Sequence, residues 1–417
     1  MISLLKEWGL NREVFFLGLA RAADSFGASL MIILIPLFVK HYSITFLAIP
    51  VTILIGIILS TYGIINTLTQ PSVGIFIDKF GNLKLFITIG LTVYSLATLL
   101  FIWVQSFIGL ILLRVIQGVG VALTLPSTMT LMTEYTNPET RGTAMSFYNV
   151  MRLVGFSTGP LLGGYLISIY GFPVVITIGA FAGLLGAVLV QTLVHEPVID
   201  RSNLPDSSFF DDLQAFVDPE MLDFVKLAFA NVTMALSISL VAPLENEFNQ
   251  KLDQGPEAFG VAFSALIITL MIVQIPIGRI ADTIGRKILI VSGLIILIPT
   301  TIWMGHVATT GQFILARMIQ GVGVACVAAP SFALGGDKSN KENRGKEMSL
   351  LTMAFGLGIG LGPLIAGLMA GLITFEAPFW FGGFLLIVSV VLVGFTVPGS
   401  KIVETSTIPG QSTPEEH

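Results

Sequence analysis

Charged residues are scarce in this sequence: they make up 11% of its 417 residues, whereas an average soluble domain has about 25%. So few charges could not cover the surface of a water-soluble protein of this length. Hydrophobic residues account for 54% of the chain. The composition therefore excludes an ordinary soluble domain and indicates that lipid is the solvent for most of the chain.

Reactive and metal-binding residues are also few. Cys326 is the only cysteine, which excludes an intramolecular disulfide. The sequence has no Walker-type phosphate-binding loop, no H-E-x-x-H motif and no G-x-S-x-G in a suitable context. The histidines are scattered, at His41, His195, His306 and His417. We therefore expect that the protein is not an enzyme and that it has no metal site and no cofactor.

Long apolar stretches recur along the chain, separated by polar gaps. A transmembrane helix needs about 20 mainly apolar residues, which predicts an all-α integral membrane protein with twelve transmembrane helices. The expected spans are 14–39, 47–76, 84–105, 107–133, 144–169, 173–194, 224–248, 257–281, 287–308, 311–335, 347–373 and 379–397. The chain then divides into a six-helix half at 1–194, a central linker at 195–223, a second six-helix half at 224–397 and a tail at 398–417.

The central linker is acidic, and its apolar residues Phe209, Leu213, Phe216 and Val217 fall at helical spacing. Such spacing is typical of an amphipathic helix on the membrane surface, although helices of that kind usually carry Lys or Arg on the polar face. A simple linker with a few apolar contacts explains the pattern equally well.

Lysine and arginine are distributed unequally between the two sides of the predicted bundle. When the termini and the even-numbered connections are placed on one side, the other side holds only Lys40 and Lys251. Connections rich in Lys and Arg stay on the cytoplasmic side. We therefore expect a multi-pass protein of the plasma membrane with both termini and the central linker in the cytoplasm.

The second half of the sequence repeats the first. Segments 70–81, 114–122, 137–142 and 155–160 recur in order at 274–285, 317–325, 340–345 and 358–363, at a shift of 203 or 204 residues. Four blocks in register indicate a duplication. Because each half has an even number of spans, both halves cross the membrane in the same direction. Parallel repeats are a known plan of transporters, whose halves rock about a site between them.

Three motifs in the repeat are specific enough to compare with a family. The connection after the second span carries Gly74, Asp78 and Gly81, and its second copy adds Arg286 and Lys287 where the first has Asn82 and Leu83. The fourth span carries Arg-x-x-Gln-Gly at 114–118, and the fifth carries Gly-x-x-x-Gly-Pro-x-x-Gly-Gly at 155–164. With these motifs the chain resembles the major facilitator superfamily over nearly its whole length, and the third motif resembles the signature of its twelve-helix drug/proton antiporters.

The resemblance implies an inner gate at the connections after the second and eighth spans. Glycines there would let helices or turns approach closely, and an aspartate at a helix end would bind backbone N–H groups or an arginine. A topological anchor with turn glycines is the alternative. The gate residues would be Gly74, Asp78, Gly81 and Arg141 in the first half, and Gly278, Asp282, Gly285, Arg286 and Arg344 in the second.

The motif of the fifth span consists of Gly155, Gly159, Pro160, Gly163 and Gly164. The proline removes a backbone donor and can kink the helix, and the glycines allow tight packing and bending. A near copy lies at 358–367. Helix packing common to both halves therefore explains part of this motif.

Asp24 is the only carboxylate that the expected spans place deep in the membrane, about 15 Å into the first span. An acid at that depth indicates a functional site, and Arg21 lies one turn away on the same face. Asn231 occupies the equivalent position of the second half. We hypothesise that Asp24 binds and releases a proton while an arginine competes for its carboxylate. A static buried ion pair that fixes helix packing is the alternative.

These features predict a secondary active transporter that works by alternating access, as a monomer in the lipid bilayer. The main hypothesis is efflux of hydrophobic or drug-like small molecules driven by the proton gradient. The alternative is a symporter or uniporter of a metabolite, organic anion, sugar or lipid, because the arginines of the spans outnumber the acid. No nucleic-acid partner is expected. The residues expected to form the proton and substrate cavity are Asp24, Arg21, Arg114, Gln117, Asn149, Arg152, Asn231, Arg317 and Gln320.

Overall fold

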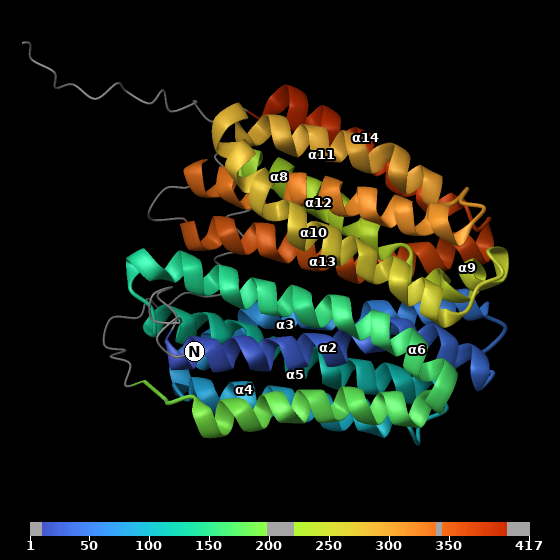
Figure 1. Cartoon of the computed structure of the whole chain (residues 1–417), viewed down its shortest axis with the longest axis horizontal. Helices are drawn as coiled ribbons and strands as arrows, with labels where there is room; N and C mark the ends of the chain where they lie inside the picture. Colours follow the sequence, from blue (N-terminus) through green and yellow to red (C-terminus); the bar gives the residue numbers. More distant parts are fainter. Residues whose placement is uncertain (1–10, 198–220, 339–343, 398–417) are drawn as a thin grey trace, which may run out of the picture.

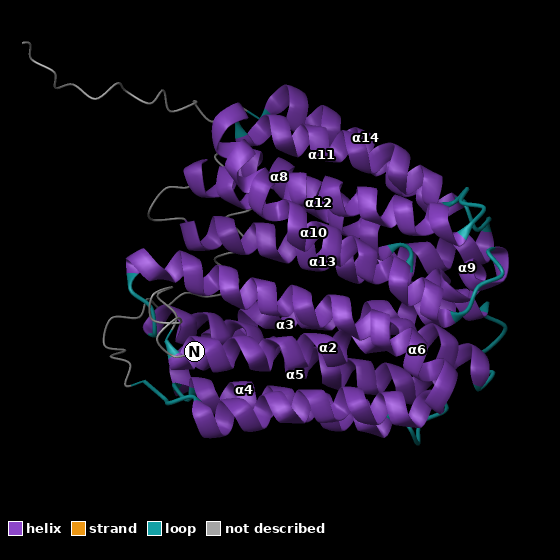
Figure 2. Cartoon of the chain, in the orientation of Figure 1, coloured by secondary structure: helices purple, strands orange, loops and turns teal. Residues whose placement is uncertain are grey.

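The computed structural model describes residues 11–197, 221–338 and 344–397, and the long elements in these ranges are all helices (Figure 2). The proposed surface helix of the central linker and the tail lie outside the described residues. The elements of the first half are α2 (Arg12–His41), α3 (Val51–Phe80), α4 (Leu83–Leu100), α5 (Phe107–Glu134) and α6 (Pro138–Leu193). Those of the second half are α8 (Leu222–Ser239), η2 (Ala242–Leu244), α9 (Glu245–Lys251), α10 (Pro256–Ile284), α11 (Arg286–Met304), α12 (Thr310–Lys338), α13 (Arg344–Leu372) and α14 (Ala377–Thr396).

The element α6 contains two membrane crossings. It has 56 residues, and a helix needs only about 20 to cross a bilayer. Its backbone leaves the helical region at Gly171, where φ is 75° and ψ is 179°, a conformation that is essentially restricted to glycine. The arm before Gly171 runs parallel to α2, and the arm after it runs antiparallel. Within the described residues, the eleven long apolar helices therefore make the twelve crossings that the sequence predicts.

The directions of the two arms follow from glycine contacts with α2. Before the break, Gly155 lies against Ala22 and Gly163 lies against Leu30. After the break, the order reverses, because Gly179 lies against Gly27 and Gly186 lies against Ala20.

The seventh crossing is not one helix. The sequence predicts a single span at 224–248, but α8 ends at Ser239 and is followed by the 3₁₀ turn η2 and the short helix α9. Pro243 lies in η2, and proline has no N–H to donate and clashes with the preceding helical turn. The predicted span is present, since Leu222–Lys251 is long and apolar enough to cross a membrane, but its helix is interrupted after Ser239.

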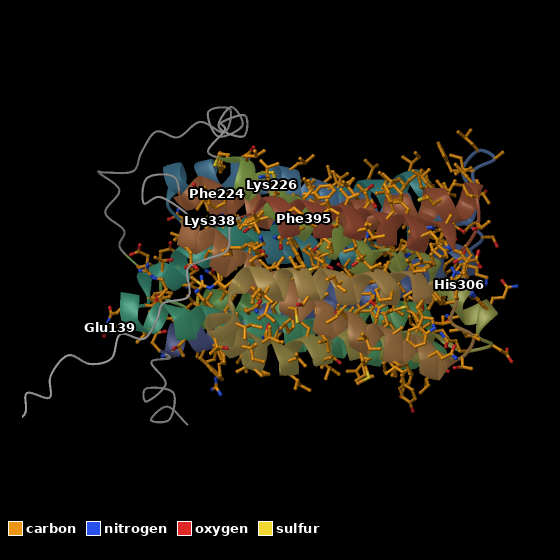
Figure 3. All side chains as sticks on the ribbon, turned by 90° about the horizontal axis from the view of Figure 1, so that it is seen from above. Glu139, Phe224, Lys226, His306, Lys338 and Phe395 are labelled. Atoms are coloured by element: carbon orange, nitrogen blue, oxygen red, sulfur yellow. The ribbon has the colours of Figure 1, made fainter. Side chains whose placement is uncertain are left out.

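The helices form two groups whose axes run roughly parallel to one another (Figure 1). Helices α2–α6 lie in one group and α8–α14 in the other, and the described chain ends lie at the end opposite α9. We call these two ends of the bundle the terminal end and the α9 end. Glu139 and Lys338 lie at the terminal end and His306 at the α9 end (Figure 3).

Large apolar side chains project from the outside of the bundle. Phe395 is 85% exposed and Trp380 is 54% exposed, and Figure 3 shows Phe395 on the flank of the bundle. A soluble monomer rarely exposes contiguous apolar surface on this scale. These side chains are suited to contact lipid, so the fold agrees with the membrane class that the composition indicates.

The terminal end of each half is held together by polar contacts. Glu196, which follows α6, accepts hydrogen bonds from the backbone N–H groups of Leu83 and Lys84 at 2.8 and 2.9 Å, and so caps the start of α4. In the second half, Asp223 pairs with Lys226 of α8 and Lys338 of α12, at 3.2 and 2.8 Å.

The Tyr135 side chain, which follows α5, ties the ends of two first-half helices together. Its hydroxyl donates to the backbone carbonyl of His195. Burial raises the pKa of the Tyr135 phenol well above its ordinary value, with a smaller contribution from the charges of Glu13 and Glu196. The phenol therefore remains a hydrogen-bond donor throughout the physiological pH range.

The two halves meet along two helix pairs, α3 with α13 and α6 with α10. Four side-chain hydrogen bonds join the halves within the described part of the chain, and they lie at the α9 end or near the middle of the helices. The pairs are Asn246 Nδ2 with Pro36 O at 2.8 Å, Thr52 Oγ1 with Glu247 Oε1 at 2.7 Å, Ser168 Oγ with Glu257 Oε2 at 3.2 Å, and Ser264 Oγ with Ser157 O at 2.6 Å.

The same helices have free space toward the terminal end. A Cβ atom added at Gly74 of α3 or at Gly278 of α10 would have no heavy atom within 4 Å outside its own helix. The hydrogen bonds that hold the halves together thus lie at the α9 end and near the middle of the helices, and we call this contact the closure of the α9 end.

Candidate transport site

The predicted pair of Asp24 and Arg21 forms in the middle of α2. Nη1 of Arg21 donates to Oδ2 of Asp24 at 2.6 Å, and the two side chains are 12% and 4% exposed. Oδ1 of Asp24 and Nε of Arg21 are buried and have no hydrogen-bond partner among the described residues. The guanidinium also lies 5.8 Å from the ring centre of Tyr148 in α6. The carboxylate thus keeps one oxygen free to accept a proton.

A small pocket adjoins this pair. Its walls come from four helices of the first half, with Thr124 and Thr128 of α5 and Tyr148 of α6 facing the two charges. From the duplicated halves, Asp24 is expected at a cavity between them. In the structure it lines a pocket within the first half, because α2 packs between the two arms of α6.

The Arg-x-x-Gln motif forms the same chain of hydrogen bonds in both halves. Arg114 donates to Gln117 at 2.9 Å, and Gln117 donates to Thr98 at 2.8 Å. In the second half, Arg317 donates to Gln320 at 2.9 Å. Gln320 in turn lies 3.4 Å from Thr301, which is 203 positions after Thr98. Arg114 and Arg317 are 3% and 1% exposed, so both side chains are buried within the bundle.

Aromatic rings cover these buried guanidinium groups. Arg114 lies 5.4 Å from the ring centre of Tyr62 and 5.7 Å from that of Phe101. Arg317 lies 5.0 Å from the ring of Phe263 and also donates to the carbonyl of Ile238. The Nε atoms of both arginines are buried and have no partner among the described residues.

Arg152 and Asn149 meet on one face of α6. Nε and Nη2 of Arg152 both donate to Oδ1 of Asn149, at 3.1 and 2.9 Å. Within the described residues no carboxylate forms a salt bridge with Arg114, Arg152 or Arg317. The middle of the bundle therefore carries three cationic groups that no described acid neutralises.

Asn231 is not near the Asp24 pocket but lies in the second half. It is fully buried, it accepts a hydrogen bond from Ser331 at 3.1 Å, and it donates to the carbonyl of Leu227 at 2.9 Å. This position therefore holds α8 and α12 together, and the two halves differ chemically where the first half has its carboxylate.

The structure describes only some residues of the expected inner gate. Gly81 and Gly285 end α3 and α10 with positive φ angles of 88° and 96°, so they act as turn glycines. A Cβ atom added at Gly74 or Gly278 would meet no heavy atom of another helix within 4 Å. The side chains of Asp78, Asp282 and Arg344 lie outside the described residues.

The described arginines of the gate have partners within their own half. Arg286 pairs with Asp337 and donates to the carbonyl of Ala333 at 2.6 Å, which links α11 to α12. Arg141 lies 3.5 Å from the carbonyl of Thr133. The sequence analysis did not anticipate Asp337 as a partner, because the first half has no arginine at the position equivalent to Arg286.

The glycine-proline motif of the fifth crossing is a packing surface. A Cβ at Gly155 or Gly159 would overlap α2, and one at Gly164 would overlap Pro256 of α10. The helical backbone continues through Pro160 and leaves the helical region at Gly171. Gly358 and Gly362 meet α8 in the same way as Gly155 and Gly159 meet α2. The motif therefore places helices close together in both halves.

Glu245 is a buried acid that the sequence analysis did not identify. It begins α9, its exposed fraction is 0%, and neither carboxylate oxygen has a hydrogen-bond partner among the described residues. Its burial does not follow from depth in the membrane, which is the criterion that selected Asp24. Glu245 lies near the end of its span, where an acid usually reaches water, and the two residues that follow it bond to the first half. Pro243 two residues earlier was the available signal of an irregular helix.

Comparison with known proteins identifies the family. The model of the Major Facilitator Superfamily matches residues 17–222 and 227–415. The chain belongs to this superfamily. Among curated relatives, a transporter from Methanocaldococcus jannaschii named as an uncharacterized MFS-type transporter is 24% identical over 76% of this chain and 82% of its own length. The multi-drug resistance efflux pump PmrA of Streptococcus pneumoniae is 23% identical over 84% of this chain and 88% of its own length.

Solved structures of transporters share the fold. A bacterial homologue of the human lysosomal transporter Spinster, in an inward-facing and occupied conformation, has a TM-score of 0.76 and 15% identity, and covers 91% of this chain and 95% of its own. A peptide transporter has a TM-score of 0.77 and 14% identity, and covers 93% and 94%. This chain is thus a membrane transporter with the twelve-crossing facilitator fold, and not an enzyme.

Proposed function

We propose that this transporter exports hydrophobic or drug-like small molecules in exchange for protons, by alternating access. The observation that carries the proposal is the buried pair of Arg21 and Asp24 beside a pocket of the first half. A carboxylate in a membrane interior is costly and indicates proton or ion coupling. The duplicated half has Asn231 instead, so the coupling chemistry belongs to one half.

The arrangement of the halves supports alternating access. The halves touch at the α9 end, and their hydrogen bonds to each other lie there or near the middle. The distribution of Lys and Arg supports a terminal end in the cytoplasm of a plasma-membrane protein. The structure then corresponds to an inward-facing state, and transport requires the α9 end to open.

Asp24 would couple this movement to protons through Arg21. In the ionised state its carboxylate accepts a hydrogen bond from the guanidinium. A proton on the carboxylate removes the charge that holds the guanidinium, which is then free to turn toward Tyr148 or the substrate. Return of the guanidinium displaces the proton. The energy source would be the proton gradient, and the proposed functional unit is the monomer.

The substrate class is proposed from the relatives, since PmrA is named as a multi-drug resistance efflux pump. A second candidate is transport of an organic anion. It is favoured by Arg114, Arg152 and Arg317, which form no salt bridge with a described acid. A guanidinium binds a carboxylate or phosphate with two parallel hydrogen bonds, so these groups suit an anionic substrate.

The experiment is transport by protein reconstituted in liposomes that contain a pH-sensitive dye. A proton gradient is imposed, and lipophilic cations, neutral drugs, sugars and organic anions are added singly to the wild type and to Asp24→Asn. We expect a lipophilic compound to dissipate the gradient with the wild type only. If organic anions alone do so, the second candidate replaces the first. Asp24→Asn protein that still accumulates substrate against its gradient would refute the role of Asp24.

A further inference from the structure

The carboxyl group of Glu245 has an environment that no other described carboxyl group shares. Its exposed fraction is 0%, and both Oε1 and Oε2 are buried without a hydrogen-bond partner among the described residues. An ionised carboxylate in such a place would lose its hydration and gain nothing in return, so the group neutralises by binding a proton. Glu245 in this closed arrangement is therefore a carboxylic acid.

The position of Glu245 connects it to the contact between the halves. Asn246, the next residue, donates to Pro36 of the first half at 2.8 Å. Glu247 accepts from Thr52 of the first half at 2.7 Å. Ala242, three residues earlier, belongs to the hydrophobic core of the first half, together with Ile55 and Leu59. Glu245 is thus buried by the closure of the α9 end.

No described cation faces Glu245 across this contact. Glu247, two residues further along α9, is another acid, and a like charge nearby opposes ionisation. Lys251 on the same helix is held by Gly305 and Glu376 at 2.6 and 3.9 Å.

The helices packed against this corner offer no partner either. Lys40 and His41 of α2 are exposed, and Glu257 of α10 accepts a hydrogen bond from Ser168. The other charged groups of α2, α3, α10 and α13 belong to the middle or the terminal end of the bundle.

We propose that Glu245 is a second proton-binding site, distinct from Asp24, and that the α9 end closes only when Glu245 has taken up a proton from the adjacent solution. In the open state water hydrates the carboxylate and it ionises. Closing binds one proton and opening releases it, so that each closure consumes one proton from the outer side. The inference rests on the proposed alternating access, but not on the substrate or on coupling at Asp24.

The sign of the pH dependence follows from this uptake. A closure that binds one proton becomes about tenfold less favourable for each unit that the pH rises, once the hydrated carboxyl is ionised. Acid on the outer side therefore closes the α9 end, and alkali opens it. The equivalent position of the first half is Phe38, so only the second half carries this switch.

The experiment measures the opening of the α9 end directly. Cys326 is replaced by Ser, and spin labels are attached at Thr45→Cys and Ala308→Cys, which are exposed sites on opposite halves of the α9 end. Distance distributions are recorded in lipid nanodiscs between about pH 5 and 8, in the wild type, Glu245→Gln and Glu257→Gln. Glu257 is the matched control, because it is an exposed acid that also bonds across the halves.

We expect the closed fraction of the wild type and of Glu257→Gln to fall with rising pH, by about tenfold in the closed-to-open ratio per unit. Glu245→Gln, a neutral mimic of the protonated acid, should stay closed throughout. A wild type whose distances do not change with pH, or a Glu245→Gln protein that keeps the full dependence, would overturn the proposal.

An infrared measurement keeps the proposal testable if Glu245→Gln does not fold. The carbonyl stretch of a protonated carboxylic acid is recorded at neutral pH, in the wild type, Asp24→Asn and Glu257→Gln. A band present in all three supports the proposal, and its absence from all three contradicts it. Neither the spin-label distances nor the infrared band involves transport. Both results would therefore stand even if the protein did not transport the proposed substrates or did not couple transport to protons at Asp24.

Discussion

Gly63 of α3 and Gly360 of α13 touch backbone to backbone across the contact between the two halves. A Cβ at Gly63 would lie 2.7 Å from the Cα atom of Gly360, and one at Gly360 would lie 3.0 Å from the backbone nitrogen of Ile64. Only a residue without a side chain permits this approach. The closure of the α9 end therefore depends on glycine at this crossing.

Gly63→Leu should hold the halves apart at this crossing. Overpacking of this kind costs about 1 to 3 kcal/mol, which lowers the closed-to-open ratio roughly tenfold to a hundredfold. The label pair at the α9 end should report longer distances, and substrate transport should fall accordingly. Gly394→Leu, at a glycine of α14 with no neighbour within 4 Å, is the control. Unchanged distances in Gly63→Leu would contradict the backbone contact.

The glycines of the fifth and eleventh crossings should contribute equally to stability. A Cβ at Gly159 would lie 2.8 Å from the carbonyl of Phe26, and one at Gly362 would lie 3.1 Å from the carbonyl of Leu236. We expect Gly159→Ala and Gly362→Ala each to destabilise by about 1 to 3 kcal/mol, seen as a lower midpoint of thermal unfolding in detergent. Gly394→Ala should be neutral or slightly stabilising. A loss confined to Gly159→Ala would instead support a function specific to the fifth crossing.

Arg21 and Asp24 should be strongly coupled in a double-mutant cycle. Arg21→Met leaves the Asp24 carboxylate buried without a partner, which costs about 3 to 5 kcal/mol. Adding Asp24→Leu removes the unpaired charge, so the double variant should recover most of the lost stability. Unfolding midpoints of the four proteins measure the coupling. Additive losses would show that the pair does not interact as the geometry indicates.

Glu196 should stabilise the start of α4. Its carboxylate accepts from the N–H groups of Leu83 and Lys84, and loss of a helix cap costs about 0.5 to 2 kcal/mol. Glu196→Ala should therefore lower the unfolding midpoint and speed amide hydrogen exchange at both positions. Glu134→Ala, at an exposed acid that ends α5, is the control. Exchange at Leu83 that is as slow as in the wild type would rule out the cap.

The repeat and the apolar spans were predictable because they depend on local chemistry. Lipid requires each crossing to satisfy its own backbone hydrogen bonds, so length and composition alone identify the helices. The sequence does not predict that Gln117 and Gln320 bond to Thr98 and Thr301. These contacts join neighbouring helices, and the threonines belong to no motif.

The sequence alone determined the membrane class, the duplicated halves, the Major Facilitator Superfamily resemblance and the pairing of Arg21 with Asp24, which lie one helical turn apart. Only the tertiary structure decided which groups are buried. Asp24 adjoins a pocket within one half, because the two arms of α6 enclose α2. Glu245 loses contact with water because the other half covers the end of its span. Hydration is decided by neighbours that are distant in the sequence, and no local pattern encodes it.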